Sequence, residues 1–215
     1  MKIVAISDTH GSHYEMRHPI PSCDILIHAG DLTSDGSMEA LADSIEWLNN
    51  QEATHKVLIA GNHDWAFQKT PMIARRLVRE KSDIIYLEEE SATIMGLKVF
   101  GSPWSPFFLN WAFNARRGEE IRKHWDKIPH DTDVLITHGP SFGWRDELMF
   151  QHLGCRDLYE KVIEVQPVLH IHGHIHAGYG RSEMSHPSGK ETTVVNASIC
   201  TEGYMPVNKP IEIDL

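Results

Sequence analysis

Short runs of apolar residues, rich in valine and isoleucine, recur along the chain and do not alternate with polar positions. Continuous hydrophobicity over about four to eight residues is typical of strands that are covered on both faces. Five such strands are predicted: Lys2–Ser7, Asp24–His28, Lys56–Ala60, Asp133–Thr137 and Pro167–His172.

Helical periodicity separates several of these strands. In Ser37–Asn50 the apolar residues recur three or four positions apart, and Ser37 is well placed to cap the first turn. Similar patterns occur in Pro71–Lys81 and Arg156–Val165. Strands alternating with helices favour an α/β fold.

Further strands follow from β-rich runs beside glycine or near the end of the chain. Ala92–Met95 and Leu97–Phe100 flank Gly96 and predict a hairpin, and Thr192–Asn196 and Ile211–Asp214 predict two more short strands. The pattern indicates either one mixed sheet or two packed sheets. No linker or repeat divides the sequence, so we expect one domain over residues 1–215.

Composition excludes several classes of protein. With 215 residues, 41% of them hydrophobic and 23% charged, the chain is neither disordered nor collagen-like. Its formal charge of −10 argues against binding of large nucleic acids by electrostatic attraction to the phosphate backbone. The 15 histidines are unusually many, and histidine is both the commonest metal ligand and an acid or base near neutral pH.

The cysteines and the apolar runs give an expectation about location. Cys23, Cys155 and Cys200 are odd in number and far apart, so they predict neither a zinc ribbon nor a disulfide framework. We find no signal peptide, and no apolar run approaches the ~20 residues of a membrane span. We therefore expect a cytoplasmic protein without a membrane partner, and the sequence leaves its oligomeric state open.

Polar side chains able to bind metal follow each of the five buried strands. In open α/β sheets ligands bind beyond the carboxyl ends of the strands, so these side chains are expected to meet in one crevice. Seven nitrogen and oxygen donors are too many for one tetrahedral zinc and suit two adjacent ions, with Mn, Fe or Zn favoured over Mg or Ca. The candidate ligands are Asp8, His10, Asp31, Asn62, His138, His174 and His176.

These residues lie in five ordered motifs. They read Asp-x-His at Asp8, Gly-Asp at Asp31, Gly-Asn-His-Asp from Gly61, a single His138, and Gly-His-x-His from Gly173. In this order they resemble the signature of the calcineurin-like metallophosphoesterase superfamily. The resemblance implies an α/β sandwich of two mixed β-sheets flanked by helices.

A closer similarity is to the subfamily of metallophosphoesterase-domain-containing proteins. It is carried by Gly101–Trp104, Asn110–Asn114, Ile136–Pro140 and His174–Gly180. This similarity implies a metal-dependent phosphodiesterase that includes cyclic nucleotides among its substrates. The Ser/Thr protein phosphatases instead carry an arginine shortly after Gly-Asp, which this chain lacks, and Asp35 is left without a role.

The family pattern also implies how the ligands divide. One ion would be held by Asp8, His10, Asp31 and His176, and the other by Asp31, Asn62, His138 and His174. Asp31 would bridge them. Two ions about 3.5–4 Å apart lower the pKa of a bridging water and clamp the phosphate for in-line attack by the resulting hydroxide.

Three residues of the Gly-Asn-His-Asp motif are candidate catalytic residues. Asn62 is a ligand, whereas His63 is absent from both ligand sets and is expected to protonate or stabilise the departing oxygen. Asp64 either orients His63 or caps a helix that begins near Trp65.

An aromatic stretch, Trp104–Phe113, is the candidate for substrate choice because its rings could stack on a base. Trp104, Trp111 and Asn114 are the candidate substrate-binding residues, although a loop packed on the core explains the stretch equally well. The arginines that could neutralise a phosphate are Arg116, Arg117 and Arg145.

The leading hypothesis is therefore a phosphodiesterase with two divalent ions, Mn above all in vitro, acting on small phosphodiesters such as 2′,3′- or 3′,5′-cyclic nucleotides. The rival enzyme is a metal-dependent phosphomonoesterase; a nuclease is disfavoured by the charge of −10. A hypothesis from another class is a non-catalytic interaction module on the same fold.

Overall fold

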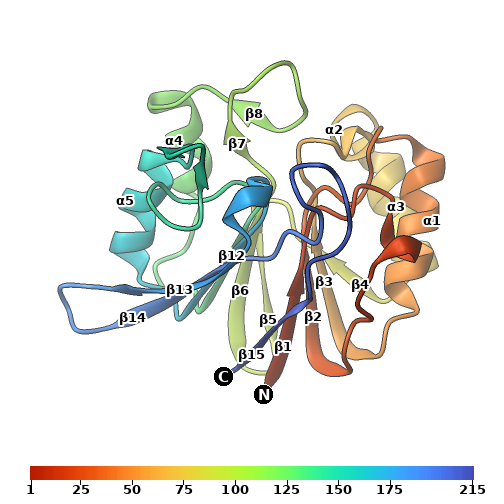
Figure 1. Ribbon diagram of the computed structural model, residues 1–215, viewed down its shortest axis with the longest axis horizontal. Coiled ribbons are helices and arrows are strands. Elements are labelled where there is room, and N and C mark those ends of the chain that lie inside the picture. The colour runs from red at the N-terminus through yellow and green to blue at the C-terminus, as the bar shows by residue number, and fades with distance from the viewer.

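The computed structural model describes residues 1–215 and contains two large sheets packed between helices (Figure 1). The first sheet has the strand order β15-β1-β2-β3-β4, in which β15 is antiparallel to β1 and the other neighbours are parallel. Its strands are β15 (Ile211–Asp214), β1 (Lys2–Ile6), β2 (Cys23–Ala29), β3 (Ala53–Ile59) and β4 (Ile84–Tyr86).

The second sheet has the order β13-β14-β12-β9-β6-β5. Its two outer pairs are antiparallel and its inner pairs are parallel, so both sheets are mixed. Its strands are β13 (Gly180–Ser185), β14 (Glu191–Asn196), β12 (Leu169–His172), β9 (Val134–Thr137), β6 (Leu97–Ser102) and β5 (Glu90–Ile94). The expected sandwich of two mixed sheets is confirmed, and the alternative of one sheet is excluded.

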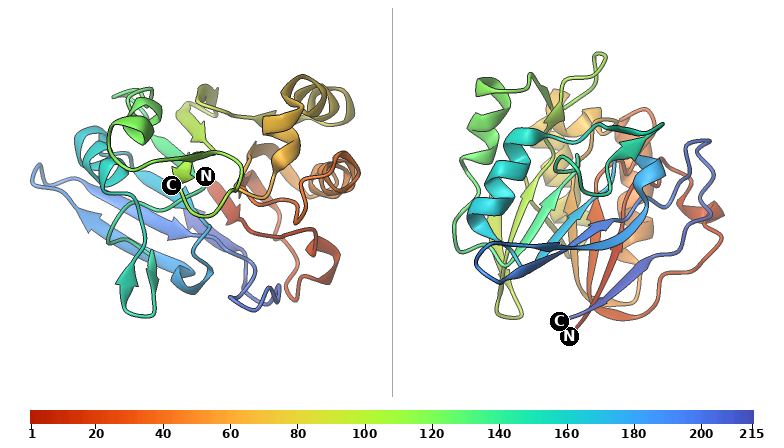
Figure 2. Two further views of the ribbon diagram at one scale, coloured as in Figure 1. Left: turned by 90° about the horizontal axis from the view of Figure 1, so that it is seen from above. Right: turned by 60° about the vertical axis from the view of Figure 1, so that its left-hand side comes forward.

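Helices cover the outer faces of the two sheets, as Figure 2 also shows from above and from the side. The first sheet is covered by α1 (Met38–Asn49), α2 (Trp65–Lys69) and α3 (Pro71–Lys81), and the second by α4 (Glu119–Trp125) and α5 (Arg156–Val165). The N–H of Ala40 donates to the Ser37 hydroxyl at 3.2 Å, which confirms the expected cap of α1.

A continuous apolar layer lies between the two sheets. Ile27 and Val57 of the first sheet share one buried cluster with Ile136 and Ile171 of the second. The other faces of these strands pack against the helices, for example Leu58 against the cluster that contains α1. Burial on both faces is the reason that the strands read as continuous apolar runs.

The predicted strands and helices are all present, with small shifts at their ends. The sequence patterns did not identify α4 and β13, whose apolar residues are few, or β4, which has only three residues. They also did not identify the short elements η1 (His13–Glu15), β7 (Ser105–Pro106), β8 (Asn114–Ala115), β10 (Glu147–Leu148), β11 (Gln151–His152) and η2 (His176–Gly178). None of the helices has the length and hydrophobicity that a membrane span requires.

Candidate metal centre

The predicted motifs converge at one end of the sandwich, opposite the two chain termini (Figure 1). Strands β1, β2 and β3 of the first sheet run parallel, as do β9 and β12 of the second, so their carboxyl ends open toward the same edge. The loops that follow these strands carry the polar residues. This placement agrees with the rule that open α/β sheets bind ligands beyond their carboxyl ends.

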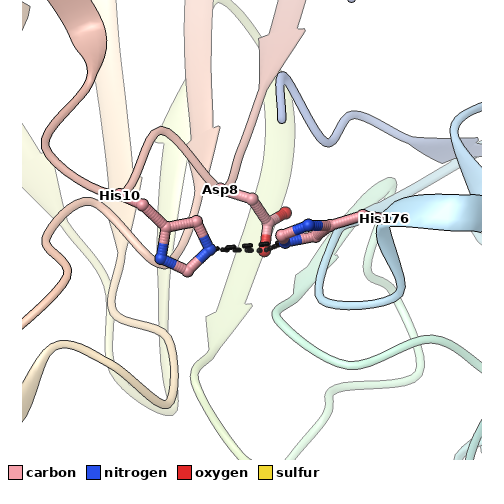
Figure 3. Close-up of side chains that lie close together, drawn as sticks. All are labelled: Asp8, His10 and His176. Atoms are coloured by element: carbon pink, nitrogen blue, oxygen red, sulfur yellow. Dashed lines mark hydrogen bonds and ion pairs between the residues drawn. The ribbon is translucent and has the colours of Figure 1, made fainter. Parts of the chain in front are cut away.

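Asp8, His10 and His176 form the first cluster of donors (Figure 3). Nε2 of His176 lies 3.4 Å and Nε2 of His10 lies 4.0 Å from Oδ1 of Asp8. The two Nε2 atoms are 3.3 Å from each other. Three side chains from two distant parts of the chain therefore direct their donor atoms to one point.

Asp31, His138 and His174 form the second cluster, and Asn62 joins it. Nε2 of His138 lies 3.3 Å from Oδ2 of Asp31 and 2.8 Å from Oδ1 of Asn62. The same Oδ2 of Asp31 is 3.7 Å from Nε2 of His10 in the first cluster. The Asp31 carboxylate is thus positioned between the two clusters, as a bridging ligand would be.

Hydrogen bonds to carbonyl groups orient two of the imidazoles. Nδ1 of His138 donates to the carbonyl of Ala29 at 3.0 Å, and Nδ1 of His176 donates to the carbonyl of Thr201 at 2.9 Å. Because a carbonyl only accepts, Nδ1 carries a hydrogen, and Nε2 is the ring atom that faces the centre. These rings are held in the orientation from which a deprotonated Nε2 could bind a metal.

The Asp8 carboxylate is fixed by donors from three parts of the chain. The N–H of His174 lies 3.0 Å from its Oδ2, the Ser198 hydroxyl donates to the same oxygen at 2.8 Å, and the Ser7 hydroxyl donates to it as well. A Cβ at Gly173 would collide with this carboxylate and with Ser7, so glycine is required there. The close approach of two loops therefore depends on Gly173.

Four of the candidate ligands adopt a left-handed backbone conformation that residues other than glycine rarely use. The φ angles are 53° at Asp8, 46° at His10, 52° at Asp31 and 66° at His174. Such strain persists only where the surroundings impose it, and it concentrates at functional sites.

The charges at the centre depend on one another. Burial raises the pKa of Asp31, but the His138 imidazole more than offsets this and holds that pKa below its usual range. Burial lowers the pKa of His138, and the Asp31 carboxylate more than compensates and raises it to about 9. Ionised carboxylates buried among imidazoles need compensating positive charge, and Mn, Fe and Zn accept this mixture of nitrogen and oxygen donors. The residues present fit two divalent ions.

His63 lies at the edge of the same centre. Its Nδ1 donates to the carbonyl of Ser34 at 2.9 Å, and its ring packs against Trp111 with a centroid distance of 4.0 Å. A donor atom of His63 is within 4.8 Å of donors of His10 and Asp31, although the family pattern placed His63 outside both ligand sets. The residue is therefore close enough to touch a bound phosphate ester.

Asp64 performs neither of the two tasks expected of it. Its carboxylate makes no capping hydrogen bond to α2, and its partners do not include His63. It accepts instead from the N–H groups of Leu32 at 3.1 Å, Thr33 at 2.9 Å and Gly61 at 2.8 Å. This buried carboxylate ties the loop after β3 to the loop after β2, which explains why an acid is needed.

A cavity of about 460 Å³ opens beside the donors. Of the three candidate substrate-binding residues, only Trp111 lines it. The Trp104 ring instead stacks on His124 with centroids 3.7 Å apart, and the Asn114 amide donates to the Ser105 hydroxyl at 3.0 Å. Trp104 and Asn114 therefore lie outside the lining of this cavity: Trp104 packs the aromatic loop against α4, and Asn114 closes the base of the loop, so their role in substrate binding stays a prediction.

The candidate arginines also separate. Arg117 lines the cavity, but its guanidinium donates to the carbonyls of Leu153 at 2.6 Å and Gly154 at 2.7 Å. Arg145 donates to the Arg181 carbonyl, away from the lining residues, and Arg116 is exposed outside the lining.

Asp35, which had no predicted role, has a local structural one. Its Oδ1 accepts from the N–H of Ser37 at 2.9 Å, just before α1. Hydrogen bonding to this backbone lowers the pKa of Asp35. The side chain is exposed and does not line the cavity.

The sequence analysis missed a C-terminal segment that contributes to the centre. Thr201 holds His176 through its carbonyl, and the Tyr204 ring lies edge-on to His10 and His176 at centroid distances of 4.9 and 5.4 Å. Ser198 binds Asp8 as described above. These residues belong to no motif and follow the last predicted ligand by more than twenty positions, so no local pattern marked them.

Comparison with known proteins agrees with this geometry. Residues 1–178, which include all seven candidate ligands, match the family model described as calcineurin-like phosphoesterase. The chain belongs to the calcineurin-like phosphoesterase family. It is similar to metallophosphoesterase domain-containing protein 1 of Homo sapiens, with 37% identity across 100% of this chain and 71% of that protein, and equally to the Mus musculus protein of that name.

A similar fold is also found among solved structures. The chain superposes on phosphopantetheinyl hydrolase from Mycobacterium tuberculosis with a TM-score of 0.61 and 15% identity, covering 94% of this chain and 90% of the other. At this identity the likeness concerns the fold alone.

Proposed function

We propose that this chain is a phosphodiesterase that uses two divalent metal ions to hydrolyse small phosphodiesters, with 2′,3′- and 3′,5′-cyclic nucleotides as the first substrates to test. The observation that carries the proposal is the position of Asp31, whose Oδ2 is 3.3 Å from His138 and 3.7 Å from His10. One carboxylate between two sets of donors is the arrangement that a two-metal hydrolase requires. Three unpaired cysteines are consistent with a cytoplasmic location.

The proposed ligands of one ion are Asp8, His10, Asp31 and His176, and those of the other are Asp31, Asn62, His138 and His174. When bound, such ions supply Lewis-acid activation of water and neutralise charge on the phosphate; Mn, Fe and Zn all suit the donors. The buried carboxylates of Asp8 and Asp31 would hold the ions, and the carbonyls of Ala29 and Thr201 orient the His138 and His176 rings.

His63 is the proposed group at the leaving oxygen. Its Nδ1 is engaged with the Ser34 carbonyl, which leaves Nε2 to face a substrate in the cavity that His63 lines. A protonated His63 can give the Nε2 hydrogen to the departing oxygen, and such assistance contributes about 10²–10⁴ in rate. Trp111, which packs on His63, would contact the same end of the substrate.

The deciding experiment compares turnover of bis(p-nitrophenyl) phosphate, p-nitrophenyl phosphate, 2′,3′-cAMP and 3′,5′-cAMP by Mn²⁺-loaded protein. The proposal expects hydrolysis of the diesters, and the cyclic nucleotides identify the isomer. Activity on the monoester alone would make the chain a phosphomonoesterase. Metal binding without any turnover would favour a non-catalytic interaction module.

The variant Asp31→Asn keeps the size of the side chain and removes its charge. We expect it to lose most of the bound metal and nearly all turnover, because Asp31 serves both ions in the proposal. Asp35→Asn is the matched control, since Asp35 is exposed and only contacts the backbone before α1. Full metal content in Asp31→Asn would overturn the bridging role.

A further inference from the structure

The cavity beside the metal-ligating residues has a wall of apolar side chains that metal binding does not explain. Apart from Trp111, which packs on His63, six apolar lining residues come from two segments outside the metal-ligand motifs. They are Pro106 at the end of β7, Phe107, Phe108 and Leu109 from the loop between β7 and β8, and Leu148 and Leu153 from the region of the β10–β11 hairpin. We call these six residues the apolar wall.

The exposure of this wall is costly in the free protein. Phe107, Phe108 and Leu109 are consecutive and between 58% and 64% exposed. Contiguous apolar side chains of this size are rarely left in water unless they meet a ligand or partner. Their position on the lining of a cavity of about 460 Å³ points to a small ligand, because the volume is typical of small-molecule sites.

The backbone of this loop is held in place, so the apolar display is fixed. The N–H of Phe107 donates to the carbonyl of Ala115 at 2.8 Å, and the N–H of Phe108 donates to Oδ1 of Asn114 at 3.2 Å. The N–H of Ser105 donates to the carbonyl of Phe113 at 2.9 Å. A loop anchored at three points presents its side chains without a large loss of freedom on binding.

The β10–β11 hairpin, which contributes Leu148 to the wall, also exposes large apolar side chains at its turn. Met149 and Phe150 form its two-residue turn, have φ angles of 48° and 63°, and are 84% and 96% exposed. Turns of this kind favour Asn-Gly, because bulky side chains are strained at positive φ. A large exposed apolar pair at such a turn, next to Leu148 in the wall, is unfavourable for folding and extends the apolar surface outward.

Charge in the cavity argues against a highly charged substrate. Apart from the candidate ligands and His63, the charged side chains of the lining are Arg117 and Glu202. The Arg117 guanidinium already donates to the carbonyls of Leu153 and Gly154. Arg117 keeps its charge, but the same lining holds Glu202, of opposite sign, so a second phosphate or a carboxylate on the substrate would meet one cation and one anion, whereas an uncharged organic group would find apolar contact on the six residues of the wall.

We propose that the apolar wall binds an uncharged, largely apolar ester group of the substrate, alkyl or aryl, while the phosphate lies at the metal centre. The inference rests on the proposed phosphodiesterase function and narrows its substrate class. A phosphodiester joins its phosphate to organic groups through two ester bonds, and one of these groups lies against Phe107, Phe108 and Leu109. In a nucleotide substrate, the aromatic face of the base is the only part that matches this uncharged, largely apolar group.

The test uses p-nitrophenyl phosphodiesters whose second ester group is methyl, butyl or octyl, with Mn²⁺-loaded protein. Each buried methylene strengthens binding up to about fourfold. We expect kcat/KM to rise at least tenfold from the methyl to the octyl ester. If the methyl ester is clearly hydrolysed and kcat/KM is the same for all three esters, the proposed role of the apolar wall is wrong, and the phosphodiesterase proposal is unaffected.

The combined variant Phe107→Ser, Phe108→Ser and Leu109→Ser is expected to lose most of the advantage of the octyl ester. Its matched control is Met72→Ser with Ile73→Ser on α3, two exposed apolar residues outside the cavity lining. The control should keep the wild-type series. Circular dichroism and thermal unfolding test whether the loop variant is folded. If it is unfolded, the comparison of methyl, butyl and octyl esters with the wild-type protein still decides the question.

Calorimetry separates the two proposals. Dibutyl phosphate should bind the Mn²⁺-loaded protein more tightly than dimethyl phosphate and with a more negative heat-capacity change, the mark of apolar burial. This result supports the wall even if no diester is hydrolysed, an outcome that would overturn only the proposed function. Two results would overturn the inference. If the wild type self-associates and the loop variant does not, the wall binds a second copy of the chain. If the wild type sediments with phosphatidylcholine vesicles and the loop variant does not, the wall binds a lipid surface.

Discussion

The main-chain N–H of His63 donates a hydrogen bond to Oδ1 of Asp31 at 2.8 Å. The residue proposed to assist the leaving group is thereby tied to the carboxylate proposed to bridge the ions. Oδ2 of Asp31 remains directed at His10 and His138. A shift of the bridging carboxylate would therefore move His63 with it, which couples metal binding to the position of the acid.

Replacement of His63 by alanine separates a catalytic role from a ligand role. We expect His63→Ala to retain its metal content and to lose about 10²–10⁴ in kcat on an alkyl leaving group, which needs a proton to depart. The loss should be much smaller with p-nitrophenolate, a good leaving group without protonation. Metal analysis and both assays check this, with the exposed His130→Ala as control. Loss of metal in His63→Ala would place His63 among the ligands.

Replacement of Asp64 by asparagine should weaken the fold. In either orientation the amide NH2 would replace one accepting oxygen and face either the N–H of Thr33 or the N–H groups of Leu32 and Gly61, and a buried donor without an acceptor costs about 1–3 kcal/mol. We expect urea unfolding of the metal-free protein to shift by that amount. Asp35→Asn is the control, because Asp35 is exposed. Equal stability of the two variants would contradict the role assigned to Asp64.

Removal of the Tyr204 ring should weaken one metal site. The ring packs edge-on against His10 and His176, so it restrains both imidazoles. We expect Tyr204→Ala to lower the affinity for Mn²⁺ about tenfold, as loss of groups that orient ligands commonly does. Tyr204→Phe keeps the ring and should keep the affinity, and Met205→Ala is the neighbouring control. Titration calorimetry with Mn²⁺ measures all three; unchanged binding in Tyr204→Ala would refute the prediction.

The buried His170 should make stability depend on pH. Burial holds its pKa well below the ordinary 6.5, and the nearby His172 lowers it further. The folded state favours the neutral ring, so the stabilising effect of this histidine on the folded state is complete above about pH 6.5. As the pH falls below that value, the unfolded chain takes up a proton and the free energy of unfolding decreases. The loss from this one group reaches about 1.4 kcal/mol per pH unit.

Urea unfolding of metal-free protein between pH 5 and pH 7 tests this dependence. His170→Leu removes the proton uptake and should unfold with a shallower pH dependence than the wild type. The exposed His130→Gln should parallel the wild type. A His170→Leu curve parallel to the wild type would show that His170 is protonated in the folded protein.

The sequence was sufficient to predict most of the long strands and helices and to name the candidate donor side chains that the fold brings together. Continuous apolar runs such as Lys56–Ala60 report burial on both faces, and the spacing in Ser37–Asn50 reports one buried helix face; both depend on residues close in the chain. The donors could be predicted because each follows a strand directly, and the carboxyl ends of parallel strands open toward one edge.

The tertiary structure decided what local patterns do not contain. Periodicity does not say which strands pair, and only the packing of two sheets brings His138 of the second sheet within 3.3 Å of Asp31 of the first. It also decided that Trp111 lines the cavity whereas Trp104 stacks on His124, since the path of that loop depends on hydrogen bonds between distant backbone groups.

The same distinction applies to Thr201 and Tyr204, which reach His176 across about 25 residues of chain. Their contribution is a carbonyl group and a ring edge, and neither leaves a recurring pattern in the sequence. The amino-acid sequence by itself thus determined which side chains are candidates to bind metal, because metal binding requires particular donor groups and here they follow the strand ends. The orientation of those side chains and the shape of the substrate cavity were decided by contacts between segments far apart in the chain, which exist only once the two sheets have packed.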